Sequence, residues 1–127
     1  MRRLLPTGLI IALITFIAAC SPSPESWSDG TQTITGIYGD RHCETQSVQF
    51  LRLDDLTFAM DPKHKMPADA VSGAFEADAT LPADATDSGF RSEAKELWRV
   101  PDDSAIYIVD SKTTARWPAV SKNYGCD

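Results

Sequence analysis

An apolar run near the N-terminus limits how much of this chain can fold as a domain. Residues Leu9–Ala19 are apolar except for Thr15, and they follow Arg2 and Arg3. The run has 11 residues, whereas a membrane-spanning helix needs about 20 and the apolar part of an export signal roughly 7–15. We therefore expect residues 1–19 to be a signal peptide with a helical apolar part, which leaves 108 residues for the rest of the protein.

The end of the run indicates the type of signal. Ile17-Ala18-Ala19-Cys20 is an aliphatic residue, two small residues and a cysteine. It resembles the lipobox of bacterial lipoproteins, in which the cysteine thiol accepts a diacylglyceryl group and becomes the first mature residue. The resemblance implies a fatty acyl (palmitate) anchor at Cys20 on the extracytoplasmic face of the cell membrane. The alternative is an ordinary secretory signal cleaved after Ala19, which Ile17 fits less well than Ala would.

The segment that follows the cysteine differs from a folded domain in composition. Ser21–Gly30 (SPSPESWSDG) is rich in Ser, Pro and acidic residues, a composition typical of disordered chain. We expect residues 20–30 to be a lipidated, flexible tether and residues 31–127 to be the domain. Trp27 is unusual in a tether: it either docks on the domain or lies at the level of the lipid headgroups, and the sequence leaves both open.

The number of cysteines indicates one disulfide. The chain has three cysteines, and lipidation of Cys20 would leave Cys43 and Cys126 as a pair. Export places them in an oxidising environment, where paired thiols usually become disulfides; two free thiols are the alternative. Closing so long a loop is worth about 4.5 kcal/mol in the chain-entropy model. Neither cysteine has the Cys-x-x-Cys spacing of a redox pair, so we expect a structural bridge.

Beyond the tether, short β segments alternate with turn residues. The predicted strands are Thr31–Tyr38, Ser47–Leu53, Leu56–Met60, Phe90–Arg91, Glu96–Val100, Ala105–Val109 and Thr113–Trp117. We expect a hairpin turn at Asp54-Asp55 and a short helix near Ala68–Ala77, within an irregular segment of residues 61–89. The spacing predicts a mainly β fold: a single small antiparallel domain in the form of a meander, a sandwich or a rolled sheet.

Alternation within the strands predicts the core. The expected core residues are Val48, Phe50, Leu51, Phe58, Phe90, Leu97, Trp98, Ile106, Ile108 and Trp117. Trp98 and Trp117 lie on neighbouring predicted strands, where an exposed pair would make an aromatic platform for sugar or peptide. Buried packing is the commoner fate of such residues.

Several short motifs of the mature region are loosely shared with one group of proteins. They are Asp40–Glu44 (DRHCE), Ser47–Leu53 (SVQFLRL), Asp61-Pro62, Leu81–Phe90 (LPADATDSGF), Glu96-Leu97-Trp98, Arg116-Trp117-Pro118 and Gly125-Cys126. On these residues the region is similar to small uncharacterised lipoproteins of actinobacterial cell envelopes. The resemblance implies a location in the cell envelope and brings no activity with it.

The charge of the chain argues against nucleic acid as a partner. The net charge is −6, and removal of the signal leaves 10 basic and 18 acidic residues. Binding of nucleic acid requires a basic face that neutralises phosphates. An acidic domain is also repelled by anionic lipid, so the lipid anchor would have to provide the contact with the membrane.

One cluster has the chemistry of a metal site. Met60, His64 and Met66 fall within seven residues, and thioether sulfur and imidazole suit Cu(I). Lys63 and Lys65 flank the histidine, and their charge opposes binding of a cation. A copper or small-ligand module on the first three residues is therefore the alternative hypothesis. The simpler interpretation is a core Met60, a solvent-exposed His64 and a loosely packed Met66.

Two weaker patterns resemble a zinc site and a catalytic serine motif. His42, with Asp40 and Glu44, suggests zinc only if Cys43 stays reduced. Ser92-Glu93-Ala94-Lys95 matches the Ser-x-x-Lys of penicillin-recognising enzymes, but their partner motifs are absent from the sequence. We expect no cofactor and no enzymatic activity. The sequence predicts a lipid-anchored, extracytoplasmic module that binds or interacts with an unknown partner at the cell envelope.

Overall fold

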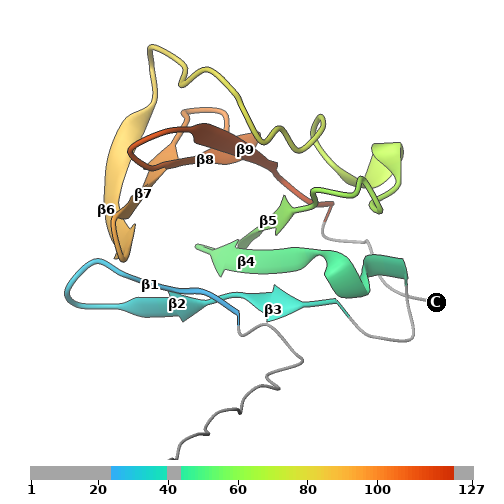
Figure 1. Cartoon of the computed structure of the whole chain (residues 1–127), viewed down its shortest axis with the longest axis horizontal. Helices are drawn as coiled ribbons and strands as arrows, with labels where there is room; N and C mark the ends of the chain where they lie inside the picture. Colours follow the sequence, from blue (N-terminus) through green and yellow to red (C-terminus); the bar gives the residue numbers. More distant parts are fainter. Residues whose placement is uncertain (1–23, 40–43, 122–127) are drawn as a thin grey trace, which may run out of the picture.

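The computed structural model describes residues 24–39 and 44–121. They form a mainly β domain of two antiparallel sheets, with short 3-10 turns at Glu44–Ser47 (η2) and Ala68–Ala70 (η3) (Figure 1). The prediction of a mainly β, antiparallel fold is confirmed.

Several sequence predictions lie outside the described residues. They concern the signal peptide (residues 1–19), the lipidation site Cys20 and the disulfide between Cys43 and Cys126. Within the described ranges, the structure contains no helix that is long and apolar enough to cross a membrane.

The strands divide unequally between the two sheets (Figure 1). The larger sheet has the order β2-β1-β6-β7-β8-β9 and the smaller one the order β3-β4-β5. The bounds are β1 Ser26–Ser28, β2 Thr33–Thr35, β3 Ile37–Tyr38, β4 Gln49–Leu53, β5 Leu56–Met60, β6 Thr86–Ser92, β7 Lys95–Arg99, β8 Ala105–Val109 and β9 Thr114–Pro118. All pairs are antiparallel, and short hairpins connect β1 to β2, β4 to β5, β6 to β7, β7 to β8 and β8 to β9.

The two sheets join at both edges and form a closed roll. At one edge β2 continues into β3 across Gly36, so one stretch of chain serves both sheets. At the other edge Phe58 of β5 pairs with Ala119, just after β9. The Val120 N–H also donates to the Thr57 carbonyl at 2.8 Å. Closure of this kind leaves few unpaired strand edges.

The core fills the inside of the roll. Its buried cluster consists of Trp27, Leu51, Leu53, Phe58, Phe75, Phe90, Leu97, Ile106, Ile108 and Trp117. Most of the predicted core residues are buried there or, in the case of Val48, in a smaller cluster on the outer face. Phe50 and Trp98 are only half-buried, because the pleat turns them outward, where they pack against the small outer clusters.

Trp27 corrects the predicted boundary of the domain. It lies in β1 with 0% of its surface exposed, so it docks on the domain, which is one of the two expected alternatives. Ser26–Ser28 pair with β2, so the domain begins before Thr31 and the boundary predicted at Gly30 is wrong. Burying an indole contributes about 4–6 kcal/mol, which offsets the loss of entropy on ordering so short a strand.

Most predicted strands are present with small shifts. Leu56–Met60 and Ala105–Val109 have the predicted bounds. The predicted strand Thr31–Tyr38 is two strands, because the chain changes sheet at Gly36. The predicted Phe90–Arg91 is the end of the longer β6, whose polar first half looks like a turn in the sequence.

The expected turn is present, whereas the expected helix is not. Asp54 and Asp55 have φ angles of 52° and 66°, the left-handed values that a tight hairpin requires. The helix predicted near Ala68–Ala77 is limited to the single turn η3. The backbone is extended at Val71, which pairs with Val120. This long-range pairing ends the helix, although the local sequence favours its continuation.

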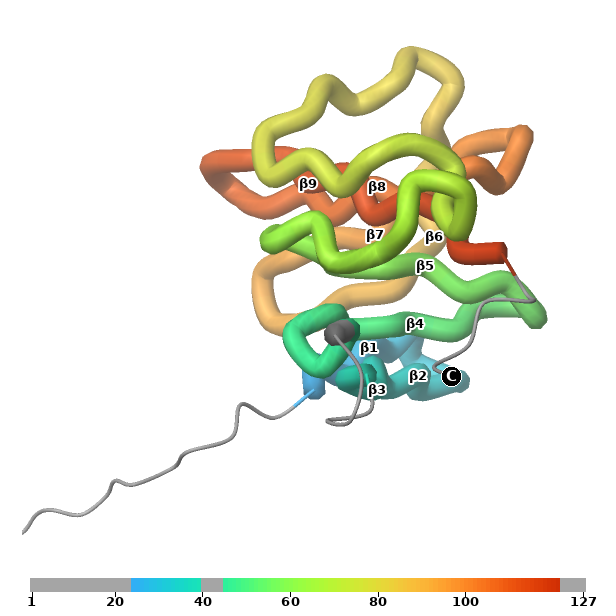
Figure 2. The backbone as a smooth tube through the Cα atoms, turned by 90° about the vertical axis from the view of Figure 1, so that its right-hand side faces the viewer, coloured from blue at the N-terminus to red at the C-terminus, as the bar shows by residue number. Residues whose placement is uncertain are grey.

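The long connection between β5 and β6, residues 61–85, lies on the outside of the roll. Figure 2 shows it, in green to yellow, on the side formed by β5, β8 and β9. Glu76 and Arg116 exchange backbone hydrogen bonds of 3.1 and 2.8 Å. The Ala79 N–H donates to the Thr114 carbonyl at 2.7 Å. The connection is therefore packed and hydrogen-bonded along β9.

The Arg116 side chain fastens this connection to β9. Its Nη1 donates to the Ala74 carbonyl at 3.0 Å, and its Nη2 donates to the Ser72 carbonyl at 2.8 Å. Gly73 lies between these carbonyls with a φ of 87°. A Cβ on Gly73 would lie 2.8 Å from Nη1, so this position needs glycine for its conformation and for the close approach of the guanidinium.

Gly73→Ala should therefore lower the free energy of unfolding more than Gly89→Ala does. Gly89 is the matched control, because its φ is 89° but a Cβ there makes only an ordinary contact at 3.9 Å. We expect the additional loss at Gly73 to be about 1–2 kcal/mol, since Arg116 must give up hydrogen bonds to neutral carbonyls. Urea denaturation measures both variants, and equal losses would contradict the role of the guanidinium.

Candidate functional site

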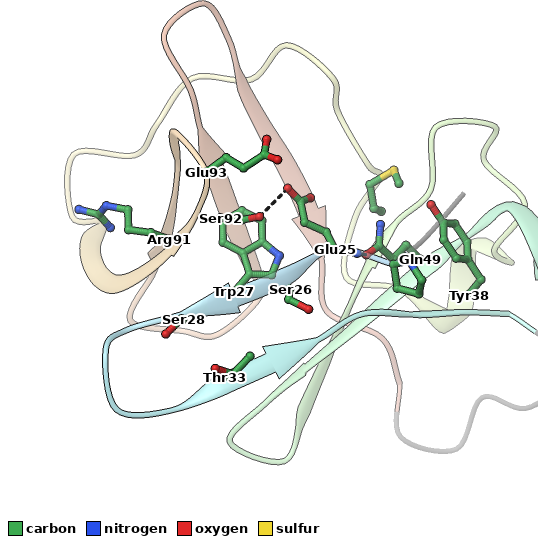
Figure 3. A pocket seen from close by; sticks show the side chains of 12 residues that line it. Glu25, Ser26, Trp27, Ser28, Thr33, Tyr38, Gln49, Arg91, Ser92 and Glu93 are labelled. Carbon is green, nitrogen blue, oxygen red and sulfur yellow. Dashed lines mark hydrogen bonds between the residues drawn. The ribbon is translucent and has the colours of Figure 1, made fainter. Parts of the chain in front are cut away.

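A cavity of about 680 Å³ opens beside β1. We call it the β1 cavity, and Figure 3 shows its lining: Pro24, Glu25, Ser26, Trp27, Ser28, Thr33, Tyr38, Gln49, Met60, Arg91, Ser92 and Glu93. It lies where two strands separate. Pairing of β1 with β2 continues to Ser26↔Thr35, whereas pairing of β1 with β6 is limited to Ser28↔Arg91.

The separation of the strands leaves a short backbone edge at Ser26. In an antiparallel ladder, the N–H and C=O of one residue point to the same side and successive residues alternate. The Glu25 carbonyl accepts the N–H of Gly36 at 2.9 Å, which orients Glu25 toward β2. Ser26 and Ser28 therefore face the β6 side, where Ser28 pairs with Arg91. Among the described residues, β6 has no partner for Ser26.

Trp27 lies between the β1 cavity and the core. Its ring packs edge-to-face on Trp117, with centroids 6.3 Å apart and an interplanar angle of 89°. Its Nε1–H is buried and has no hydrogen-bond partner among the described residues. A buried donor without an acceptor costs about 1–3 kcal/mol, so an acceptor that reached this atom would recover that energy.

Glu25 organises one wall of the cavity. The Ser92 hydroxyl donates to Glu25 Oε2 at 2.8 Å, and Figure 3 shows these two side chains directed toward each other. Lys95 Nζ forms an ion pair with the same oxygen and lies 5.8 Å from the centroid of the Trp27 ring. The two outer residues of the Ser-x-x-Lys pattern, Ser92 and Lys95, thus both position Glu25.

Gln49 supports Glu25 from the opposite side. Its side chain, 4% exposed, accepts the Glu25 N–H at 2.9 Å through Oε1. This contact depends on Gly36, because a Cβ there would lie 2.9 Å from Cγ and Cδ of Gln49 and would overlap Oε1. The glycine at which the chain changes sheet therefore also makes room for the side chain that holds Glu25.

The charged groups at the rim are paired except for Glu93, as far as the described residues show. Arg91 donates to both carboxylate oxygens of Asp87 at 2.8 and 2.7 Å and lies 3.8 Å from Glu96. These hydrogen bonds lower the pKa of Asp87 and raise the pKa of Arg91. Glu93, at the hairpin turn with a φ of 55°, has no ion pair within the described ranges. The rim is therefore acidic overall.

The structure separates the three residues of the copper hypothesis. Met60 lines the β1 cavity and packs on the inner core. His64 and Met66 line a second cavity, of about 420 Å³, next to Asp61. Met66 belongs to an outer cluster that includes Ala59, so the pleat of β5 turns Met60 and Ala59 to opposite faces. The geometry does not support a site built from all three residues.

His64 lies in a tight loop beside the second cavity, and Asp61 holds this loop in place. Asp61 is buried, and its carboxylate accepts the N–H groups of Lys65 at 2.8 Å and Met66 at 2.9 Å. The loop so formed holds His64 in a left-handed conformation, with a φ of 53°. Both oxygens of Asp61 accept backbone hydrogen bonds, so the role of this carboxylate is to stabilise the loop.

Trp98 and Trp117 do not form a shared platform. Trp117 is 4% exposed and belongs to the inner core. Trp98 packs on the outer face, where its Nε1 donates to Glu96 at 2.9 Å. One strand, β8, lies between them, and their side chains point to opposite sides of the sheet.

Little else among the described residues suggests metal chemistry. No group of three or more His, Cys, Asp and Glu residues is placed to hold an ion within residues 24–39 and 44–121. Of the weak zinc hypothesis, Asp40, His42 and Cys43 lie outside the described residues.

Comparisons of the chain with models of protein families, with curated proteins and with solved structures found no match.

The β1 cavity is not predicted by the sequence. Its first wall comes from Glu25, Ser26 and Trp27, which composition assigned to the tether. One local signal was available: a single large apolar residue between two serines, Ser26-Trp27-Ser28, is the alternation of a half-buried edge strand. Gln49 gave no such signal, because its role depends on the position of Gly36 in the folded chain.

A double-mutant cycle tests how Gly36 and Gln49 shape the cavity wall. Gly36→Ala should lower the free energy of unfolding by about 1–3 kcal/mol, because it displaces Gln49 and leaves the Glu25 N–H without its acceptor. In a Gln49→Ala background the same change should cost less than about 0.5 kcal/mol, since the clash is gone. Denaturant titration of the four proteins gives the coupling, and equal costs in both backgrounds would refute the contact.

Proposed function

We propose that this chain is a lipoprotein of the bacterial cell envelope. In this proposal, an extracytoplasmic β domain is held on the cell membrane by a lipid anchor at Cys20 and binds a partner or ligand through the β1 cavity. The observation that carries the binding role is the cavity itself. Three polar groups without a partner among the described residues meet there, and convergent polar groups are typical of binding sites: the backbone edge at Ser26, the buried indole N–H of Trp27 and the carboxylate of Glu93.

The anchor is supported by the order of the N-terminal residues. The apolar run Leu9–Ala19 is too short for a permanent span, and Ile17-Ala18-Ala19-Cys20 fits the lipobox pattern. Only a few residues separate Cys20 from Glu25 in the cavity wall. A fully extended chain of that length reaches about 18 Å, so an anchor at Cys20 would hold the cavity close to the membrane surface.

Binding is favoured over catalysis by the contacts within the cavity. The Ser92 hydroxyl donates to the Glu25 carboxylate, and the Lys95 ammonium is paired with that same carboxylate. Neither group is arranged as a nucleophile beside a free base. No histidine is among the described residues that line the cavity.

A disulfide between Cys43 and Cys126 fits the described chain on either side. Val48 and Val120 pack in the same outer cluster. The segments that lead to the two cysteines therefore leave from one region of the domain. A bridge there would fix the C-terminus beside β4 and η2.

Replacement of Cys20 tests the anchor. Cys20→Ala, expressed in a bacterial host, should lose incorporation of radioactive palmitate and should leave the membrane fraction, because neither Cys43 nor Cys126 ends a lipobox pattern. Cys43→Ser is the matched control and should keep the label. A labelled Cys20→Ala protein would exclude Cys20 as the attachment site.

The state of the other two cysteines is measured by intact mass. The exported protein should lack the two thiol hydrogens of the reduced form, because thiol oxidation removes them when the bridge forms. Cys43→Ser should lower the free energy of unfolding by about 2–4 kcal/mol. Two titratable free thiols in the exported protein would rule the bridge out.

A further inference from the structure

We propose that the β1 cavity binds an extended peptide segment with a basic side chain, and that one peptide residue pairs with the backbone of Ser26. This inference rests on the proposed binding role of the cavity and names the chemical class of the ligand. Three observations carry it: the direction of the Ser26 backbone, the buried indole donor of Trp27, which has no acceptor among the described residues, and the acidic rim.

The Ser26 edge matches one residue of an extended peptide. Its N–H and C=O point together to the β6 side, where no described residue of β6 is paired with Ser26. A residue in β conformation presents an N–H and a C=O in the complementary arrangement, so two hydrogen bonds form at one position. Strand addition of this kind provides affinity through the main chain, whatever the peptide side chains are.

Trp27 supplies a further donor beside this edge. Trp27 is one of the residues that line the cavity, and its buried Nε1–H lacks an acceptor among the described residues. Peptide carbonyls recur along an extended segment, so a carbonyl next to the residue paired with Ser26 is a suitable acceptor. A ligand without carbonyl or hydroxyl oxygens would leave the indole unsatisfied.

The charges select against an acidic ligand. Lys95 is paired with Glu25, and Arg91 lies against both Asp87 and Glu96. Glu93 remains without an ion pair in the described part of the chain, and Figure 3 shows its carboxylate on the same side of the cavity as that of Glu25. A lysine or arginine side chain of the peptide would pair with Glu93, whereas a phosphate or a carboxylate would be repelled.

The test is an NMR titration of the full chain in detergent micelles. The probe is the capped pentapeptide acetyl-Ala-Val-Lys-Val-Ala-amide, and the signals followed are the Ser26 amide and the Trp27 indole. We expect saturable shifts of both signals. The same peptide with Glu in place of Lys should bind about tenfold more weakly, and N-methylation of its central residue should weaken binding about tenfold, because one backbone hydrogen bond is lost.

A pair of variants at Ser26 isolates its N–H. Ser26→Pro removes the N–H that faces the cavity without removing a bond to β2, and proline is tolerated where the N–H points away from the ladder. Ser26→Ala keeps the N–H and, like the proline variant, loses the 3.0 Å contact with the Thr35 hydroxyl. We expect about tenfold weaker binding for Ser26→Pro and less than twofold change for Ser26→Ala. If Ser26→Pro does not fold, the N-methylated peptide with the unmodified protein makes the same comparison.

Glu93→Gln tests the charge selection. It should reduce the preference for the Lys peptide over the Glu peptide to within about threefold, because the unpaired carboxylate is gone. An unchanged preference would overturn the role of Glu93.

The remaining outcomes separate this inference from the proposed function. Absence of shifts at Ser26 and Trp27 up to about 5 mM Lys peptide overturns the inference. If maltose shifts those two signals and the peptides do not, the cavity is a ligand site of another class, so the inference is wrong and the binding role stands. If the Cys20→Ala protein is still labelled, the proposed lipid anchor is wrong, but the result of the peptide titration is not affected.

Discussion

The contact between Trp27 and Trp117 is the interaction on which the rest of the roll depends. The two rings come from the first and the last strand along the chain, and three other strands of the larger sheet lie between them. They can meet edge-to-face only because the sheet curls round on itself. Their packing fills the interior that the aliphatic side chains of β4, β7 and β8 surround.

The burial of Trp27 also determines the character of the candidate site. Successive residues of a strand point to opposite faces, so an inward Trp27 places the side chains of its neighbours outward. It also sets which backbone groups face β2 and which face β6. The residue that closes the core thus also orients the backbone of Ser26 toward β6. The stability of the core and the shape of the candidate site thus depend on the same three-residue strand.

The sequence predicts local structure well where the local signal is strong. The Asp54-Asp55 hairpin and β8 follow from turn residues and apolar alternation, and both are found as predicted. The predicted helix near Ala68–Ala77 fails because Val71 pairs with Val120, a partner that is distant in the sequence. The composition of residues 20–30 places Trp27 in the tether, because the sequence does not show that Trp27 packs on the distant Trp117. The site could not be predicted, since Gly36, Gln49 and Glu25 acquire their relation only when the two sheets join.

The outer connection shows how an irregular segment becomes part of a regular fold. Residues 61–85 contain little secondary structure, yet Arg116 holds their carbonyls and Glu76 pairs along β9. A sequence rich in Ala, Asp, Pro and Gly is therefore ordered by a strand that follows it in the chain. The composition of such a segment indicates that it forms no helix or strand. It does not indicate which strand holds the segment in place.

Closure of the roll through β5 and β9 has a consequence for how the chain acquires its structure. The contacts that complete it, Phe58 with Ala119 and Trp27 with Trp117, join residues far apart in the sequence. Such a topology has a high contact order and forms late and slowly compared with a meander of local hairpins. A nascent chain that ends before Trp117 can form the β4–β5 hairpin, but it lacks the edge-to-face partner of Trp27. The domain therefore completes its core only after almost the whole chain is present.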